Sequence, residues 1–169
     1  LRYTPKGAPM REAQVRPSSS VEPKLDPHSE TISFTVVYEI VSGLWRGTQE
    51  LVADLTNMSA FTGCVKPIPD GWLMLEPTAG TCTVRDNVSG SSFTFTGTLN
   101  GGERLLVDVA GYRAWKNPSD TWEPQRSARS ADGEISMSPG GFRATPDAEG
   151  RISMTLTSTT GRFRGRMAY

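Results

Sequence analysis

The chain has 169 residues, enough for one domain with a buried core and a further extended segment. Its 18 basic and 18 acidic side chains balance, so no overall field attracts nucleic acid or an anionic membrane. No apolar run approaches the roughly 20 residues that a membrane-spanning helix needs. We therefore expect neither nucleic acid nor a membrane as a partner. The 17 glycines and 12 prolines favour many short segments joined by turns.

Residues 1–30 show no apolar period and are rich in proline. Five of the 12 prolines fall here: Pro5, Pro9, Pro17, Pro23 and Pro27. Proline lacks a backbone donor and biases the residue before it toward extended geometry. We therefore predict an extended arm or linker, which either a partner orders or which stays disordered. Because the chain begins at Leu1 rather than at Met, we also expect further residues ahead of it.

The segment 31–69 carries two different patterns. The run TISFTVVYEIV at 31–41 alternates strictly, which predicts a strand with one apolar side. In TQELVADLTNMS, residues 48–59, apolar side chains recur at the spacing of an amphipathic helix: Leu51, Val52, Leu55 and Met58. We expect one strand and one short helix in this segment, and no other helix in the chain.

From residue 70 onward, short period-two segments alternate with turn residues. The predicted strands are WLMLE, TCTVRD, SFTFTGTL, RLLVDV, YRAW, EISMS, RISMTLTS and RFRGRMAY. Strands at such close spacing are typical of an all-β antiparallel sandwich, which we predict over residues 70–169. The last two strands are expected to form a hairpin with matching sides: Ile152, Met154 and Leu156 against Phe163, Gly165 and Met167.

The sequence offers no group of residues suited to catalysis or to metal binding. The single histidine, His28, lies in the proline-rich arm, where nothing would hold it against a nucleophile. Structural zinc takes four Cys or His ligands, and only Cys64 and Cys82 accompany His28. A glycosidase needs two carboxylates across a cleft, and nothing selects two of the available ones: Asp54, Asp70, Glu76, Asp86, Glu103 and Asp108. We expect no enzyme, no cofactor and no metal.

The four tryptophans fall into two pairs. Trp72 and Trp115 lie in predicted strands among apolar residues, and we expect them in the core. Trp45 and Trp122 lie in predicted loops beside glycine, proline or charged residues. Exposed there, they would serve as anchors at a protein interface or as platforms for a sugar ring.

The last predicted strand alternates basic residues with apolar or small ones. Period two places Arg162, Arg164 and Arg166 on one face of this strand. Such a face is either simply solvated or docks onto an acidic surface of a partner, for example that of a neighbouring copy.

The stretch FTFTGTLNGGERLLVDVAGYRAW is the most regularly patterned part of the chain. The two glycines at 101–102 allow the positive φ of a tight hairpin, and Leu105 and Val107 are expected to face the core. Asp108 then lies at a strand end. We expect it to accept hydrogen bonds from the backbone donors of the following turn, or to pair with Arg113. We therefore interpret Asp108 as an architectural residue.

Residues 86–115 resemble the β-sandwich of the distal tail proteins and related minor tail proteins of long-tailed, non-contractile bacteriophages. In that family a strand ending in G-x-L precedes a Gly-Glu turn, a segment L-x-V/I-D and a strand that contains arginine. The matching positions here are Gly97, Leu99, Gly102, Glu103, Leu105, Val107, Asp108 and Arg113. The closing segment ISMTLTSTTGRFRGRMAY is similar to the family's final hairpin, so the resemblance covers about residues 70–169.

The resemblance implies a galectin-like, jelly-roll type sandwich on a ring protein, usually a hexamer, that joins the tail tube to the tail tip or baseplate. It implies copies of the chain and other phage tail proteins as partners, assembly in the host cytoplasm, a place in the virion and no enzymatic role. Residues 31–69 would then be a remnant of the family's ring-forming domain. The alternative function on the same fold is a carbohydrate-binding module that contacts a host surface glycan.

Overall fold

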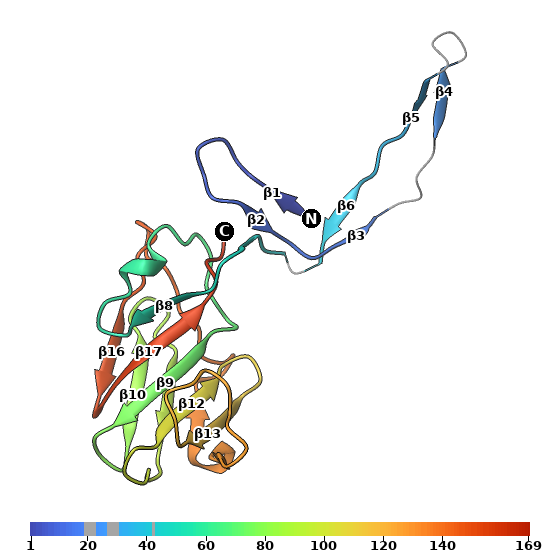
Figure 1. Cartoon of the computed structure of the whole chain (residues 1–169). Helices are drawn as coiled ribbons and strands as arrows, with labels where there is room; N and C mark the ends of the chain where they lie inside the picture. Colours follow the sequence, from blue (N-terminus) through green and yellow to red (C-terminus); the bar gives the residue numbers. More distant parts are fainter. Residues whose placement is uncertain (19–22, 27–30, 42) are drawn as a thin grey trace. The chain divides into compact units, whose positions relative to one another are not determined.

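The computed structural model describes residues 1–18, 23–26, 31–41 and 43–169. The chain divides into two compact units, Leu1–Thr48 and Gln49–Tyr169 (Figure 1). His28 lies outside the described residues. Apart from two short 3-10 turns, η1 (Ser59–Phe61) and η2 (Asp132–Glu134), the regular structure of the described residues consists of strands. The chain is therefore all-β, as its composition and periodicity predict.

The first unit is built of short antiparallel strand pairs (Figure 1). Its strands are β1 (Arg2–Tyr3), β2 (Arg11–Glu12), β3 (Val15–Pro17), β4 (Lys24–Asp26), β5 (Thr31–Ser33), β6 (Tyr38–Ile40) and β7 (Arg46–Gly47). β1, β2 and β7 form a three-stranded sheet, whereas β3 pairs with β6 and β4 with β5. Because these pairings run from β1 to β7, the unit extends past residue 30, the limit expected for the arm.

The single strand expected over residues 31–41 is in fact two strands, β5 and β6, since residues 34–37 belong to no strand. The ladder between β3 and β6 has its last strand pair at Pro17, which has no N–H to donate. The alternating apolar side chains of this segment also lack a core to pack against, because Ile32 and Phe34 are 62% and 66% exposed. Alternation here marks a two-stranded ribbon and not a core strand.

The second unit is an antiparallel β-sandwich of two sheets. The six-stranded sheet has the order β14 (Arg129–Ser130), β13 (Arg113–Asn117), β12 (Arg104–Asp108), β9 (Trp72–Pro77), β17 (Thr159–Gly165) and β8 (Leu51–Asp54). The four-stranded sheet has the order β15 (Ile135–Met137), β11 (Ser92–Phe95), β10 (Cys82–Asp86) and β16 (Met154–Thr157). Because β8 belongs to the larger sheet, the sandwich begins before residue 70, the expected boundary.

The core fills the space between the two sheets. Both sheets contribute side chains that are 0% exposed: Leu73, Leu75, Leu105, Val107 and Phe163 from one, and Val84, Phe93 and Phe95 from the other. Within each strand these residues alternate, as the pleat requires. Cys64 and Cys82 are also buried, and they form no disulfide. Burial raises the pKa of the Cys82 thiol and so keeps it protonated.

The prediction of a helix over residues 48–59 is wrong. Leu51–Asp54 is strand β8, which pairs with β17, and only the 3-10 turn η1 at Ser59–Phe61 follows it. Alternate positions at Leu51, Ala53 and Leu55 pack in the core, with Ala53 and Leu55 buried. The period-two pattern was present in the sequence, but the small side chain of Ala53 concealed it.

The prediction of a final hairpin is also wrong, because the two strands lie in different sheets. β16 pairs with β10 in the four-stranded sheet, whereas β17 pairs with β9 and β8 in the six-stranded sheet. The single residue between them, Ser158, has a φ of 55°. This left-handed conformation turns the chain from one sheet to the other, and the Ser158 carbonyl accepts a hydrogen bond from the Thr78 amide at 2.8 Å.

Candidate functional site: an arginine–tryptophan cluster on the outer face

The six-stranded sheet is covered on its outer face as well as on its core face. Leu106, Met74 and Arg162 are direct neighbours across β12, β9 and β17. By alternation they point away from the core side, to which Leu105 and Val107 belong. Leu106 and Met74 are nevertheless 0% and 1% exposed. A second, smaller apolar layer therefore lies on the outer face.

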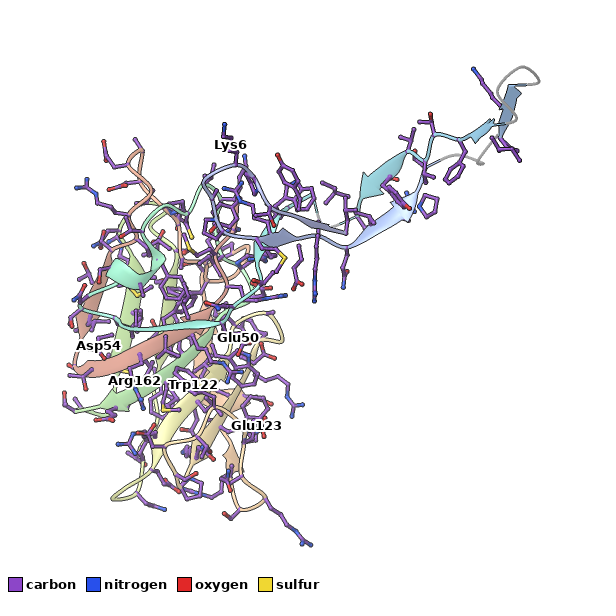
Figure 2. All side chains as sticks on the ribbon, turned by 45° about the horizontal axis from the view of Figure 1, so that its top comes forward. Lys6, Glu50, Asp54, Trp122, Glu123 and Arg162 are labelled. Carbon is purple, nitrogen blue, oxygen red and sulfur yellow. The ribbon has the colours of Figure 1, made fainter. Side chains whose placement is uncertain are left out.

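The loop at 118–128, between β13 and β14, contributes Trp122 to this layer. Figure 2 shows Arg162 next to Trp122. The guanidinium carbons of Arg162 and Arg164 lie 5.8 and 5.5 Å from the centre of the Trp122 ring. Arg162 also forms an ion pair with Asp120 of the same loop. Cation–π contacts and this ion pair together hold the loop against the sheet.

Two further tryptophans extend the cluster along the sheet. The rings of Trp72 and Trp115 stack with their centres 6.0 Å apart and their planes 16° from parallel. Arg113 lies 5.0 Å from the Trp115 ring, and Arg164 lies 6.0 Å from the Trp72 ring. Arg164 therefore bridges Trp72 and Trp122. The expectation that Trp72 and Trp115 lie in the core is wrong: they are partly buried on the outer face.

Asn117, at the end of β13, fixes the start of the loop from inside. This side chain is 0% exposed. Its amide nitrogen donates to the carbonyls of Ser119 and Thr121 at 2.9 and 3.2 Å. Its side-chain oxygen accepts the backbone N–H of Gln125 at 3.0 Å. Because one buried amide satisfies three backbone groups, the loop keeps a defined shape beneath Trp122.

A depression of about 260 Å³ lies beside Arg162, lined by Asp54, Thr56, Glu76, Thr160, Gly161 and Arg162. Its residues come from β8, the turn after it, β9 and β17. Asp54 is the register partner of Arg162 across β8 and β17. Within the described residues the Asp54 carboxylate has no hydrogen bond or ion pair, whereas Glu76 pairs with Arg104 at 2.7 Å. The depression thus presents acceptors, hydroxyl groups and one guanidinium.

The three arginines predicted to share a face do not share one role. Arg162 and Arg164 lie on the outer face, as alternation along β17 requires, and each has an acidic partner within the sandwich. The partner of Arg164 is Glu50, at 3.5 Å. Arg166 follows the last residue of β17, is partly exposed and has contacts of its own within the chain.

Asp108 lies at the end of β12, where the sequence places it. Its Oδ1 accepts the backbone N–H of Gly111 at 3.1 Å, which is the turn contact expected for it. Arg113 is its cross-strand neighbour, but the arginine forms its ion pair with Asp132 at 3.7 Å. Asp108 therefore closes the turn between β12 and β13.

The Gly-Gly turn before β12 is held by Glu103. Gly102 has a φ of 86°, the positive value that only glycine adopts readily. The Glu103 carboxylate accepts the Asn100 amide at 2.7 Å and forms an ion pair with Arg129 at 2.8 Å. The Asn100 hydrogen bond, followed by the Arg129 contact, holds the pKa of Glu103 below its ordinary value.

The remaining predicted candidate, Trp45, belongs to the first unit. Its ring lies 5.9 Å from that of Tyr3 at an angle of 52°. The sequence names Asp54 and Glu76, which line the depression with Arg162, only as two of six available carboxylates. Thr56 and Thr160, which also line it, were not predicted as site residues. Their strands lie far apart in the chain, so no local spacing signals their meeting.

Comparison with protein-family models, with curated proteins and with solved structures gives no match. Among the described residues, no three His, Cys, Asp or Glu side chains come together in a way that could hold a metal ion. The part of the chain that the structure describes has no helix of the length and apolar character needed to cross a membrane.

Proposed function

We propose that the chain is a structural subunit of a bacteriophage tail, at the tail tip or baseplate, and that it acts through contacts between protein subunits. The observation that carries this proposal is the apolar surface of the first unit. Among the described residues, its exposed large apolar side chains are Leu1, Tyr3, Met10, Ile32, Phe34, Val37, Tyr38 and Val41. Of the apolar residues of this unit whose burial is described, Ala13 alone is buried. A unit of this kind needs a partner surface to bury its apolar groups.

The β3–β6 pair shows how this surface is arranged. Val15 faces Ile40 and Pro17 faces Tyr38 across the pair, so these four side chains share one face. The opposite face carries Arg16 and Glu39, whose ion pair measures 2.8 Å. The pair is therefore amphipathic, with its charges paired on one face and its apolar residues together on the other.

Docking of this apolar face on a neighbouring subunit would be favourable. Fully burying a large apolar side chain contributes about 1.5–3 kcal/mol, and a face with several partly exposed ones supplies several times that amount before the cost of association. The resemblance of residues 70–169 to distal tail and minor tail proteins adds the biological setting. In that setting the partners are further copies of the chain, in a ring that is usually hexameric, and other tail proteins of the virion.

The first experiment measures assembly of the full chain by size-exclusion chromatography with light scattering over a range of concentrations. We expect a discrete multimer for the natural sequence. The double variant Tyr38→Asp/Ile40→Asp should shift it toward monomer with an unchanged melting temperature of the sandwich. The matched control is Arg16→Ser/Glu39→Ser on the opposite face, which should leave the multimer intact. A chain that is monomeric at every concentration and joins no other tail protein contradicts the proposal.

A second experiment tests whether the chain lies at one end of the phage tail. Antibodies raised against the chain, applied to virions of a phage that encodes it, should label one end of the tail in electron micrographs. Labelling of the capsid, or of no part of the virion, contradicts a role in the tail even if the chain forms multimers.

A further inference from the structure

The surface beside Trp122 combines an aromatic ring that is held in place with the hydrogen-bonding groups of the depression next to Arg162. Arg162 and Arg164 come from alternate positions of β17 and therefore approach the ring from the same strand face, at 5.8 and 5.5 Å. Trp122 is only partly buried. The ring thus keeps solvent-facing surface, while two guanidinium groups, the Asp120 ion pair and the loop bonds of Asn117 restrict its movement.

The depression next to Arg162 supplies polar groups of both kinds. Asp54 and Glu76 offer carboxylate acceptors, Thr56 and Thr160 offer hydroxyl groups that donate and accept, and the Arg162 guanidinium donates. Within the described residues the Asp54 carboxylate accepts no hydrogen bond and forms no ion pair, whereas the Asp54 backbone carbonyl accepts the Asn57 N–H at 2.8 Å. A ligand that binds the carboxylate therefore breaks no existing contact. At Gly161 the two strands β17 and β9 lie close together, since a Cβ atom there would lie 2.4 Å from the Met74 carbonyl oxygen.

The charges around the depression argue against an ionic ligand. A phosphate or a carboxylate would meet the acidic side chains of Asp54 and Glu76. A divalent cation would meet the Arg162 guanidinium, and no metal-binding group is found among the described residues. A neutral ligand with many hydroxyl groups is compatible with both the acidic and the basic side chains. A hydroxyl group can donate to a carboxylate and can accept from a guanidinium.

We propose that this site binds a neutral saccharide, with the apolar face of one sugar ring on Trp122 and its hydroxyl groups on Asp54 and Arg162. A volume of about 260 Å³ suits one ring of a longer glycan better than a whole drug-sized ligand, whose pockets run from about 300 Å³ upward. The site belongs to the sandwich unit, whereas the apolar face of β3 and β6 belongs to the first unit.

The test is saturation-transfer NMR on the full chain with a panel of neutral methyl glycosides: those of glucose, galactose, mannose, N-acetylglucosamine and rhamnose. We expect transfer to the ring C–H protons of at least one of them. Asp54→Asn should weaken binding about tenfold, because it removes a charged acceptor. Trp122→Ala should abolish the transfer, and Trp122→Phe should retain part of it.

Trp45→Ala is the matched control, since it removes a tryptophan of the first unit and should leave the transfer unchanged. The result that overturns the proposal is a panel without any transfer, or transfer that survives both Asp54→Asn and Trp122→Ala. Displacement of the glycoside by inorganic phosphate or by calcium would also overturn it in favour of an ion site. Sugar binding and assembly are read out separately, so the failure of one is distinguishable from the failure of the other.

Discussion

The ammonium group of Lys116 lies 2.6 Å from Oε1 of Glu134, and only 8% of the lysine side chain is exposed. This ion pair joins β13 to the η2 turn, and the Phe95 ring lies 5.9 Å from the ammonium group. The other carboxylate oxygen, Oε2, is buried without a hydrogen-bond partner. An ion pair in such surroundings contributes little to stability in itself. Removing one partner is costly, however, because it leaves the other charge buried without a partner.

Glu134→Ala should therefore lower the free energy of unfolding by about 2 kcal/mol, less than for a fully buried pair because 36% of the Glu134 side chain is exposed. Urea unfolding measures this change. The double variant Lys116→Met/Glu134→Ala removes both charges and should recover most of the loss. A double variant as unstable as the single one would show that lost packing, and not the unpaired Lys116 ammonium, causes the effect.

Trp122→Ala should lower the free energy of unfolding by about 2–3 kcal/mol, because it removes a partly buried ring together with its contacts to Arg162 and Arg164. The near-ultraviolet circular dichroism should also weaken, because a held indole ring is lost and Arg164, which also contacts Trp72, loses one of its two rings. The neighbouring residue Glu123 is exposed, so Glu123→Ala serves as the control and should change stability by less than about 0.5 kcal/mol. Equal effects of the two substitutions would contradict a stabilising role of the contacts between Trp122 and the two arginines.

Gly161→Ala should destabilise the sandwich by about 3 kcal/mol, because the added methyl group would lie 2.4 Å from a backbone oxygen of the adjacent strand, that of Met74. The backbone of β9 cannot move away without breaking its pairing with β17. Gly80→Ala is the control, since open space surrounds that position. Thermal unfolding of both variants decides the point, and a tolerated Gly161→Ala would mean that the two strands are not as close as described.

Glu103 should make stability depend on pH in the acidic range. Its folded-state pKa is lowered, first by the Asn100 hydrogen bond and then by Arg129. A lowered pKa means that the stabilisation is fully present above the ordinary pKa of glutamate and is lost as the pH falls through the lowered value. Urea midpoints measured from neutral to strongly acidic pH should fall more steeply for the natural chain than for Glu103→Gln. Parallel curves would contradict this linkage.

The alternating sequence pattern predicted most strands of the sandwich, because in these strands residues that face the core alternate with residues that point away from it. The segments WLMLE and RLLVD also carry unbroken apolar runs, such as Leu105, Leu106 and Val107, all 0% exposed. An unbroken run is typical of a strand that is covered on both faces. That signal could have predicted the outer layer and the position of Trp72 and Trp115 in it.

Pairing partners were harder to predict than strands. The predicted strands RISMTLTS and RFRGRMAY are separated by a short Thr-Thr-Gly segment, which is typical of a hairpin. In the structure Ser158 instead directs β16 and β17 into different sheets. The depression beside Arg162 depends on the same non-local order, because Asp54, Glu76 and Thr160 meet only when β8, β17 and β9 are neighbours. Neither fact has a signature within a short window of the sequence.

The position of β8 has a mechanical consequence. This strand directly follows the first unit in the chain, and all four of its residues pair with β17, which is paired with β9 on its other side. We consider a pull on the first unit that acts along the axis of β8. Because ladder hydrogen bonds stand perpendicular to the strands, such a pull shears them all together and does not unzip them one by one. A four-residue strand thereby gives the first unit an anchorage that resists tension along this axis.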